Sequence, residues 1–401
     1  MTSSAAEGLP ALLSERRAAV IGALLVALGP VSMALYTPAM PALVTAFGTT
    51  LATVKLSLTV YFAGFAFAQL LVGPLSDAFG RRPTGFGFMG LYLGGSLLAL
   101  FAPSVEVLIA ARLVQGIGAA AGVALSRAIV RDLFTGQQSA RTMNLIGIFL
   151  AIGPAIAPTI GGVILVTVGW HAIFAVMVLY GIALVSMLLY VLPETNLSRT
   201  RGAARPGTLV TNYRMLLADS RFLRPVLVLG GTVGGIYAIA TMLPFLLIDI
   251  VGLTPMEFGV GMLAQTGAFI LGGIVTKHLL RRHDASALVL PGLAISLAGG
   301  LGLAIGLRVL PPSYLAVMGP VAVFAFSIAM IMPALTTDAL APFPAHAGSA
   351  AALMGFAQMG GGLLGSAIAA VLDDTVTAMA SVLPSMIVFA CFMQFLIGRR
   401  G

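Results

Sequence analysis

The feature that most constrains the fold is a series of long apolar runs in which charged residues are almost absent. A helix rises about 1.5 Å per residue, so about 20 such residues cross the roughly 30 Å of hydrocarbon in a bilayer. The runs are continuous and do not alternate, which indicates helices and not barrel strands. Twelve spanning helices are predicted, within residues 18–54, 56–76, 83–105, 107–126, 142–193 (two helices), 225–248, 258–276, 285–307, 309–337, 339–372 and 375–398.

The composition excludes a soluble fold. Of the 401 residues, 59% are hydrophobic and 8% are charged, whereas an average soluble domain has about 25% charged residues. The 48 glycines suit helices that approach one another closely in lipid. Cys391 is the single cysteine, so an internal disulfide and a cysteine-clustered zinc site are excluded. We therefore predict an all-α integral membrane protein with no metal and no cofactor.

The basic residues predict the orientation of the chain. They occur in short groups between the apolar runs, which argues against a nucleic-acid partner despite a net charge of +8. With the N-terminus inside, 18 of the 21 lysines and arginines fall in cytoplasmic segments, as membrane insertion favours. Lys55 and Arg308 fall on the outside, and Arg112 lies within a span. Both termini are therefore expected in the cytoplasm, and the first run is a retained helix and not a cleaved signal peptide.

The chain divides into two related parts. Residues 194–224 form the one long polar stretch, predicted as a cytoplasmic linker with a short surface helix, between six-helix halves at 1–193 and 225–401. The pattern Gly73-(x3)-Asp77-(x3)-Arg81-Arg82 recurs 200 residues later as Gly273-(x3)-Lys277-(x3)-Arg281-Arg282, between the second and third helices of the second half. Such a repeat at the same topological position predicts diverged copies of one six-helix unit.

The loop of residues 73–83, GPLSDAFGRRP, resembles the G-x-x-x-D-x-x-G-R-R signature of the major facilitator superfamily. The resemblance implies a conformational latch in which Asp77 pairs across the cytoplasmic face and helps to lock the outward-open state. An ordinary basic loop would explain the arginines alone, but not the aspartate and the glycines at this spacing. The latch residues are Gly73, Asp77, Gly80, Arg81 and Arg82.

The fourth span contains RLVQGIGAA, which begins at Arg112 and resembles the R-x-x-x-G-x-G motif of proton-coupled exporters. An arginine inside a span costs roughly 2.5–3.5 kcal/mol, so we expect Arg112 to face the cavity. The resemblance implies that Arg112, with Gln115, tunes a proton-carrying site. The alternative is that Arg112, six residues after Glu106 and so about 9 Å away along the helix, extends to the outer interface.

The fifth span, GIFLAIGPAIAPTIGG, is similar to the exporter motif G-x-x-x-G-P-x-x-G-G, with Ala157 in place of one glycine. The resemblance implies antiport; the alternative is a generic kinked helix rich in glycine. The motif residues are Gly153, Pro154, Pro158, Gly161 and Gly162.

Stretches along nearly the whole chain resemble the Bcr/CflA branch of drug–proton antiporters: residues 28–43, 69–77, 169–174, 192–195 and 340–358. The resemblance implies efflux of small hydrophobic or amphiphilic drugs in exchange for protons, by a monomer in the bilayer of the bacterial inner membrane. Many branch members have an aspartate in the first helix, where this chain has Ala34. Asp338 is then a candidate proton carrier, or an exposed carboxylate at the cytoplasmic end of the tenth helix.

The substrate cavity is expected near mid-membrane between the halves, where the few charges favour a neutral or weakly polar substrate. An alternative function is an importer or metabolite exporter with altered ion coupling. An enzyme is not expected, because the four histidines are scattered and no catalytic motif is present. The candidate substrate-binding residues, each of which could instead be core packing, are Met33, Tyr36, Tyr61, Tyr237, Gln265 and Gln358.

Overall fold

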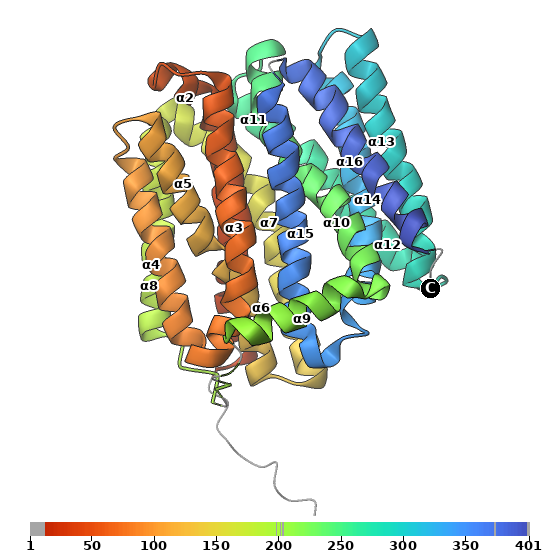
Figure 1. The fold of residues 1–401 in the computed structure, drawn as a ribbon. Helices are drawn as coiled ribbons and strands as arrows, with labels where there is room; N and C mark the ends of the chain where they lie inside the picture. Colours follow the sequence, from red (N-terminus) through yellow and green to blue (C-terminus); the bar gives the residue numbers. More distant parts are fainter. Residues whose placement is uncertain (1–12, 198, 201, 203, 373, 399–401) are drawn as a thin grey trace, which may run out of the picture.

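The computed structural model describes residues 13–197, 199–200, 202, 204–372 and 374–398. In that part of the chain all the regular elements are helical, and twelve spans are long and apolar enough to cross a membrane (Figure 1). This confirms the predicted all-α membrane fold. Three arginines of the basic pattern, Arg201, Arg399 and Arg400, lie outside the described residues.

The first six spans are formed by α1 with η1 and α2, by α3, by α4, by α5 with α6, by α7 and by α8. Their bounds are α1 Glu15–Tyr36, η1 Thr37–Ala39, α2 Met40–Ala46, α3 Leu51–Phe79, α4 Arg81–Leu100, α5 Val105–Ala119, α6 Ala121–Leu133, α7 Gly136–Thr167 and α8 Trp170–Tyr190. The first span ends earlier than predicted and the second begins earlier. Lys55, expected in an outer loop, therefore lies inside α3, because the chain turns at Gly48, with φ +58°.

The last six spans follow a helix that lies outside the bundle, α9 Pro206–Ala218. Their elements are α10 Ser220–Ile239, η2 Phe245–Ile250, α11 Pro255–Gly261, α12 Leu263–Leu279, η3 Ala285–Leu288, α13 Val289–Val309, α14 Tyr314–Leu340, η4 Pro344–His346, α15 Ala347–Val371 and α16 Thr375–Gly398. The predicted seventh span is broken after Ile239 and continues as the π-helix η2.

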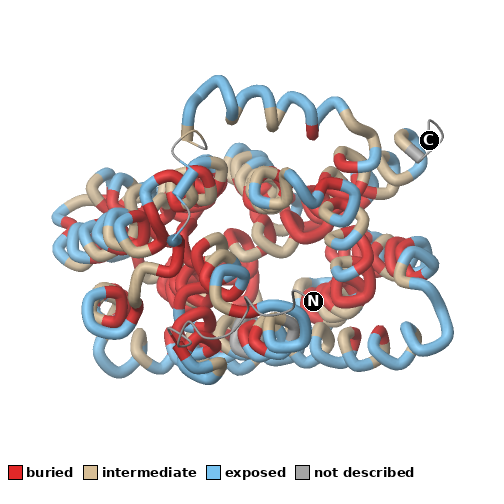
Figure 2. Tube along the Cα trace, turned by 90° about the horizontal axis from the view of Figure 1, so that it is seen from below, coloured by how far each residue is buried: buried red, intermediate tan, exposed pale blue. Residues whose placement is uncertain are grey.

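Two hydrophobic cores mark two halves. One is formed by buried residues between Leu13 and Leu192, joined by Phe245 and Met359, and the other by buried residues between Leu216 and Ala390. Seen along the helices, the buried segments gather inside the bundle, while α9 runs along one edge with mostly exposed residues (Figure 2). The boundaries at residues 194 and 224 stay a prediction.

The two ends of the bundle differ. We call the end that carries Arg81, Arg82, Arg131 and α9 the basic face, and the other end the opposite face. At the opposite face α7 packs against α11, and the Thr159 hydroxyl donates to the carbonyl of Gly259 at 2.9 Å. The basic face holds a cavity of about 680 Å³ lined by residues of both halves. A cavity of about 520 Å³ at the opposite face is lined by residues of the second half around α11. The structure is therefore closed at the opposite face and open at the basic face.

Helix α9 connects the two halves along the basic face. Its Tyr213 hydroxyl donates to the carbonyl of Leu70 on α3 at 2.6 Å, and its Leu216 is buried in the second core. The linker thus contains the predicted surface helix, which begins earlier than Thr211 because Pro206 occupies its first turn.

Close approach of α10 and α15 depends on glycine. A methyl group on Gly361 would lie 3.1 Å from the Cα of Gly234 and closer still to the carbonyl oxygen of Gly230. Without a hydrophobic force between helices in lipid, this contact of small residues provides the packing that holds the pair together.

Gly361→Ala should therefore destabilise the protein by about 1–3 kcal/mol, because the added methyl overpacks the α10–α15 contact. The measurement is thermal unfolding in detergent. Gly360→Ala is the matched control, since nothing lies within 4 Å of a methyl there. Equal unfolding temperatures for the two variants would contradict the packing argument.

Candidate functional site

The loop between α3 and α4 turns at Gly80, which has φ +107°, a backbone region that favours glycine. The Glu194 carboxylate accepts from the backbone N–H groups of Arg81 at 2.9 Å and Arg82 at 3.2 Å. The helix itself offers these N–H groups at the N-terminus of α4 no acceptor, and a negative charge is favourable there. A methyl on Gly80 would collide with this carboxylate, so both the conformation and the cap require glycine.

Arg81 is the centre of a buried ion cluster. Its side chain is 3% exposed and binds Asp132 along one edge, with Nε–Oδ2 at 2.8 Å and Nη2–Oδ1 at 3.2 Å. Its Nη1 also reaches Asp77 Oδ1 at 2.5 Å, and Arg131 lies 3.6 Å from the same oxygen. Asp77 is thus bonded within the first half here. Its predicted pairing across the cytoplasmic face stays a prediction.

Backbone contacts fix the position of this cluster. The Asn196 side chain donates to the carbonyls of Ser76 at 3.2 Å and Asp77 at 3.1 Å. Arg82 donates to the carbonyls of Leu188 and Leu189 at the end of α8. The last latch residue, Gly73, lines the cavity beside the cluster.

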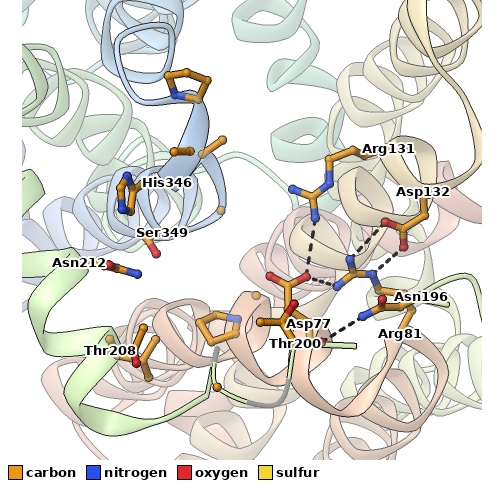
Figure 3. Close-up of a pocket in the computed structure, with 18 residues that line it drawn as sticks. Asp77, Arg81, Arg131, Asp132, Asn196, Thr200, Thr208, Asn212, His346 and Ser349 are labelled. Atoms are coloured by element: carbon orange, nitrogen blue, oxygen red, sulfur yellow. Dashed lines mark hydrogen bonds and ion pairs between the residues drawn. The ribbon is translucent and has the colours of Figure 1, made fainter. Parts of the chain in front are cut away.

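The cavity lies between the ion cluster and the second half (Figure 3). Asp77, Arg81 and Asp132 lie on one side. On the other side lie Asn212 of α9 and the segment 344–349, which leads into α15. A wall with charged side chains therefore faces one that carries Asn212, His346 and Ser349. The candidate substrate-binding residues are not among the lining of this cavity.

Arg112 lies at the centre of the first half and is fully buried. Its Cζ is 4.4 Å from the ring centroid of Tyr36 and 4.3 Å from that of Tyr61, so the guanidinium is held between two aromatic faces. Its Nη1 donates to Gln115, whose Nε2 donates to Ser96 Oγ at 2.8 Å. The side chain therefore points into the protein and does not reach the interface.

The other candidate substrate residues are spread over both halves. Tyr36 and Tyr61 belong to the Arg112 site, and Met33 is buried in the same core. Tyr237 of α10 packs against both cores and lies 5.8 Å from the ring of Phe62. Gln265 and Gln358 are half-buried on α12 and α15. The structure thus brings two of the six, Tyr36 and Tyr61, together at Arg112.

Asp338 is half-buried two residues before the end of α14, at the basic face. It is separate from the Arg112 site. This position agrees with a carboxylate at the end of the tenth span, and its part in proton transfer stays a prediction.

The three glycines of the α7 motif face two partners. A methyl on Gly153 would lie 2.9 Å from Val31, and one on Gly161 would lie 3.0 Å from Pro38. These glycines therefore allow the first span to pack closely against α7. A methyl on Gly162 would lie 3.2 Å from the Cα of Met256, across the opposite face. Pro154 and Pro158 lie inside the helix between these contacts. The motif therefore forms the contact that closes the opposite face.

Lys55 is a functional candidate that the sequence placed wrongly. It is fully buried, its Nζ donates to Thr375 Oγ1 at 3.4 Å, and it lies 5.7 Å above the Phe245 ring. These partners belong to the second half. Beside them, hydrogen bonds from Thr377 lower the pKa of Asp374, so a negative charge is retained near the lysine. Lys55 is a second contact that closes the opposite face.

Sequence reasoning missed Asp132, Glu194 and Asn196. Asp132 follows Arg131 at the end of a span, and Glu194 and Asn196 begin the linker, so each reads as an ordinary polar boundary residue. No local pattern indicates that Asp132 and Glu194 bind Arg81, 51 and 113 residues away, or that Asn196 binds the carbonyls of Ser76 and Asp77. Among the described residues, no group of three His, Cys, Asp or Glu side chains could hold a metal.

The family model for the Major Facilitator Superfamily matches residues 22–366. The chain belongs to the major facilitator superfamily. This confirms the expectation from the Gly73–Pro83 loop and makes the chain a multi-pass membrane transporter and not an enzyme.

Similar proteins agree with the predicted branch. An uncharacterised transporter of this superfamily, YdgK from Bacillus subtilis, is 32% identical over 90% of each chain. A bicyclomycin resistance protein homolog from Haemophilus influenzae is 28% identical over 87% of each chain. Multidrug resistance protein D from Escherichia coli is 29% identical over 88% of each chain. Among solved structures, a D-xylose-proton symporter has a TM-score of 0.76 at 16% identity, covering 95% of this chain and 97% of its own, which shows a shared fold.

Asp132→Asn should destabilise the protein by about 1.5–3 kcal/mol, because it removes charged hydrogen bonds from a buried arginine. Thermal unfolding in detergent measures the loss. Asp219→Asn is the control: it breaks an ion pair with Arg221, whose side chain is 70% exposed, and should change the unfolding temperature little. An Asp132 variant as stable as this control would show that Asp77 alone holds Arg81.

Proposed function

We propose that this transporter exports small hydrophobic or amphiphilic drugs in exchange for protons. The observation that carries the proposal is the position of the antiporter motif of α7, whose Gly162 and Thr159 make the contact with α11 that closes the opposite face. The names of relatives that align over nearly nine-tenths of the chain support drugs as the substrate class.

In this proposal the basic face lies in the cytoplasm, since lysine and arginine gather on the inner side of membrane proteins. The transporter acts as a monomer in the inner membrane, because one chain contains both halves. The two halves, residues 1–193 and 225–401, rock about the contacts that close the opposite face. The linker 194–224 moves with them, because its helix α9 contacts both halves. The described structure is then the inward-open state.

In this proposal the latch residue Asp77 acts when the basic face closes. Asp77 faces, across the cavity, the segment 344–349 that opens α15 (Figure 3). The first N–H groups of a helix are unsatisfied and favour a negative charge. As the cavity closes, the Asp77 carboxylate approaches this N-terminus while Arg81 keeps it oriented. The latch thus holds the outward-open state by a charge–dipole contact between the halves.

Proton coupling is assigned to Arg112 with Gln115, and to Asp338. Ala34 is buried in the first core and cannot hold a proton. Asp338 lies at the basic face, where a carboxylate can exchange protons with the cytoplasm.

The test is a substrate panel in inverted vesicles with an imposed proton gradient. Drugs such as bicyclomycin or chloramphenicol should dissipate the gradient, whereas sugars and amino acids should not. Dissipation by a sugar or an amino acid alone would establish the importer or metabolite-exporter alternative. Asp338→Asn should abolish drug-driven dissipation while drug binding persists; retained dissipation would remove Asp338 from the proton path.

Lys55→Met should shift the transporter away from the inward-open state, because it removes a buried contact between the halves at the opposite face. Spin labels at Ala46 and Val371, both exposed at that face, report the separation in a Cys391→Ser background. The population with the longer distance should grow. Arg308→Met is the matched control, since Arg308 bonds to Ala304 and Ala380 of its own half; the same shift in both variants would refute a specific role for Lys55.

A further inference from the structure

The guanidinium of Arg112 has an edge without a partner. Its Nε and Nη2 are buried and make no hydrogen bond within the described part of the chain. In that same part, all ion pairs lie elsewhere, around Arg81, Arg131 and Arg221. A buried charge without a counter-charge costs on the order of several kcal/mol, and two aromatic faces return only about 2 kcal/mol each. The site is therefore short of one anion.

The free edge has a defined binding geometry. Nε and Nη2 donate in parallel along one side of the guanidinium, which matches the two oxygens of a carboxylate. The same protein uses this edge on Arg81, where Nε and Nη2 bind the two oxygens of Asp132 at 2.8 and 3.2 Å. On Arg112 the corresponding edge is open, while Nη1 is engaged by Gln115.

The surroundings hold Arg112 in this orientation. Gln115 is itself fixed by Ser96 Oγ at 2.8 Å and Met177 Sδ at 3.2 Å. The neighbouring tyrosine hydroxyls are engaged elsewhere: Tyr36 with Ser57 at 2.6 Å and Tyr61 with the carbonyl of Gly29 at 3.0 Å. The free edge is thus preorganised, and no hydroxyl turns toward it.

We propose that the Nε–Nη2 edge of Arg112 binds the carboxylate of an amphiphilic organic anion, which is a transported substrate. This rests on the proposed function and specifies its substrate class: weak organic acids are carried in preference to their neutral amides. It replaces the expectation of a neutral substrate, because Arg112 supplies a buried positive charge that no carboxylate of the described residues pairs with.

Access to this edge requires the halves to move. Tyr61 covers one face of the guanidinium, and its neighbour Phe62 contacts Tyr237 of the second half, with ring centroids 5.8 Å apart. One aromatic layer therefore separates Arg112 from the boundary between the halves. Separation of Phe62 from Tyr237 during rocking opens this layer, and the described structure is the closed form of the site.

The test compares 4-phenylbutanoate with its neutral isostere 4-phenylbutanamide on the purified full-length transporter. Binding is measured by ligand-dependent thermal stabilisation, read from Trp170, the single tryptophan. The wild type should bind the carboxylate about 10- to 100-fold more tightly than the amide. Equal affinities for the two in the wild type overturn the inference without any variant.

Variants assign the preference to the edge. Arg112→Gln should reduce the ratio to about one, and Arg112→Lys should lose most of it, because an ammonium has no bidentate edge. Arg308→Gln, which removes one positive charge elsewhere, should keep the wild-type ratio. A carboxylate preference that survives Arg112→Gln also overturns the inference.

The inference and the proposed function fail in different measurements. If neutral drugs dissipate the proton gradient in vesicles but the purified protein shows no carboxylate preference, the Arg112 site is wrong and drug–proton exchange stands. If the carboxylate preference depends on Arg112 but no drug dissipates the gradient, the site is supported and proton exchange is wrong.

Discussion

The structure depends on one property of the bilayer: hydrocarbon offers no hydrogen-bond partner to a backbone N–H or C=O group. Each span must satisfy these groups internally, so the chain crosses as helices. Since lipid also removes the hydrophobic force between helices, their association depends on close contact of small residues. The approach of Gly361 to α10, and of Gly162 to α11, follows from this constraint. Glycine positions therefore determine which helices meet and where the halves touch.

The three buried cations Arg81, Lys55 and Arg112 differ in the groups that compensate their charge. At the basic face Arg81 is neutralised by Asp77 and Asp132, and this network holds a helix turn in place. Lys55 has only a hydroxyl and an aromatic face at a contact between the halves, which suits a bond that breaks and reforms. Arg112 has aromatic faces and one amide but no carboxylate. Three buried cations therefore have three different environments: two carboxylates, a hydroxyl with an aromatic face, and two aromatic faces with an amide.

These environments are consistent with alternating access. The basic face is held open beside a charged loop, whereas the opposite face is closed by glycine contacts, one threonine hydrogen bond and one lysine. Such contacts are small and separable, so the halves can part without breaking either core. Arg112 and its two tyrosines lie inside the first half, where Tyr36 and Tyr61 belong to the core.

The sequence alone determined the twelve spans, the two halves and the superfamily. The length of the apolar runs and the Gly73–Pro83 loop are local patterns, so both can be recognised without the tertiary structure. It also identified Gly80 and Arg112 as special positions. Tertiary structure decided their partners: Glu194 for the Gly80 turn, Asp132 for Arg81, and Thr375 for Lys55, 320 residues away in the chain. It also decided that no carboxylate contacts Arg112 in the described residues. The physical reason is that burial and charge compensation arise from segments brought together only by helix packing, and a single-chain pattern does not encode which distant side chains meet.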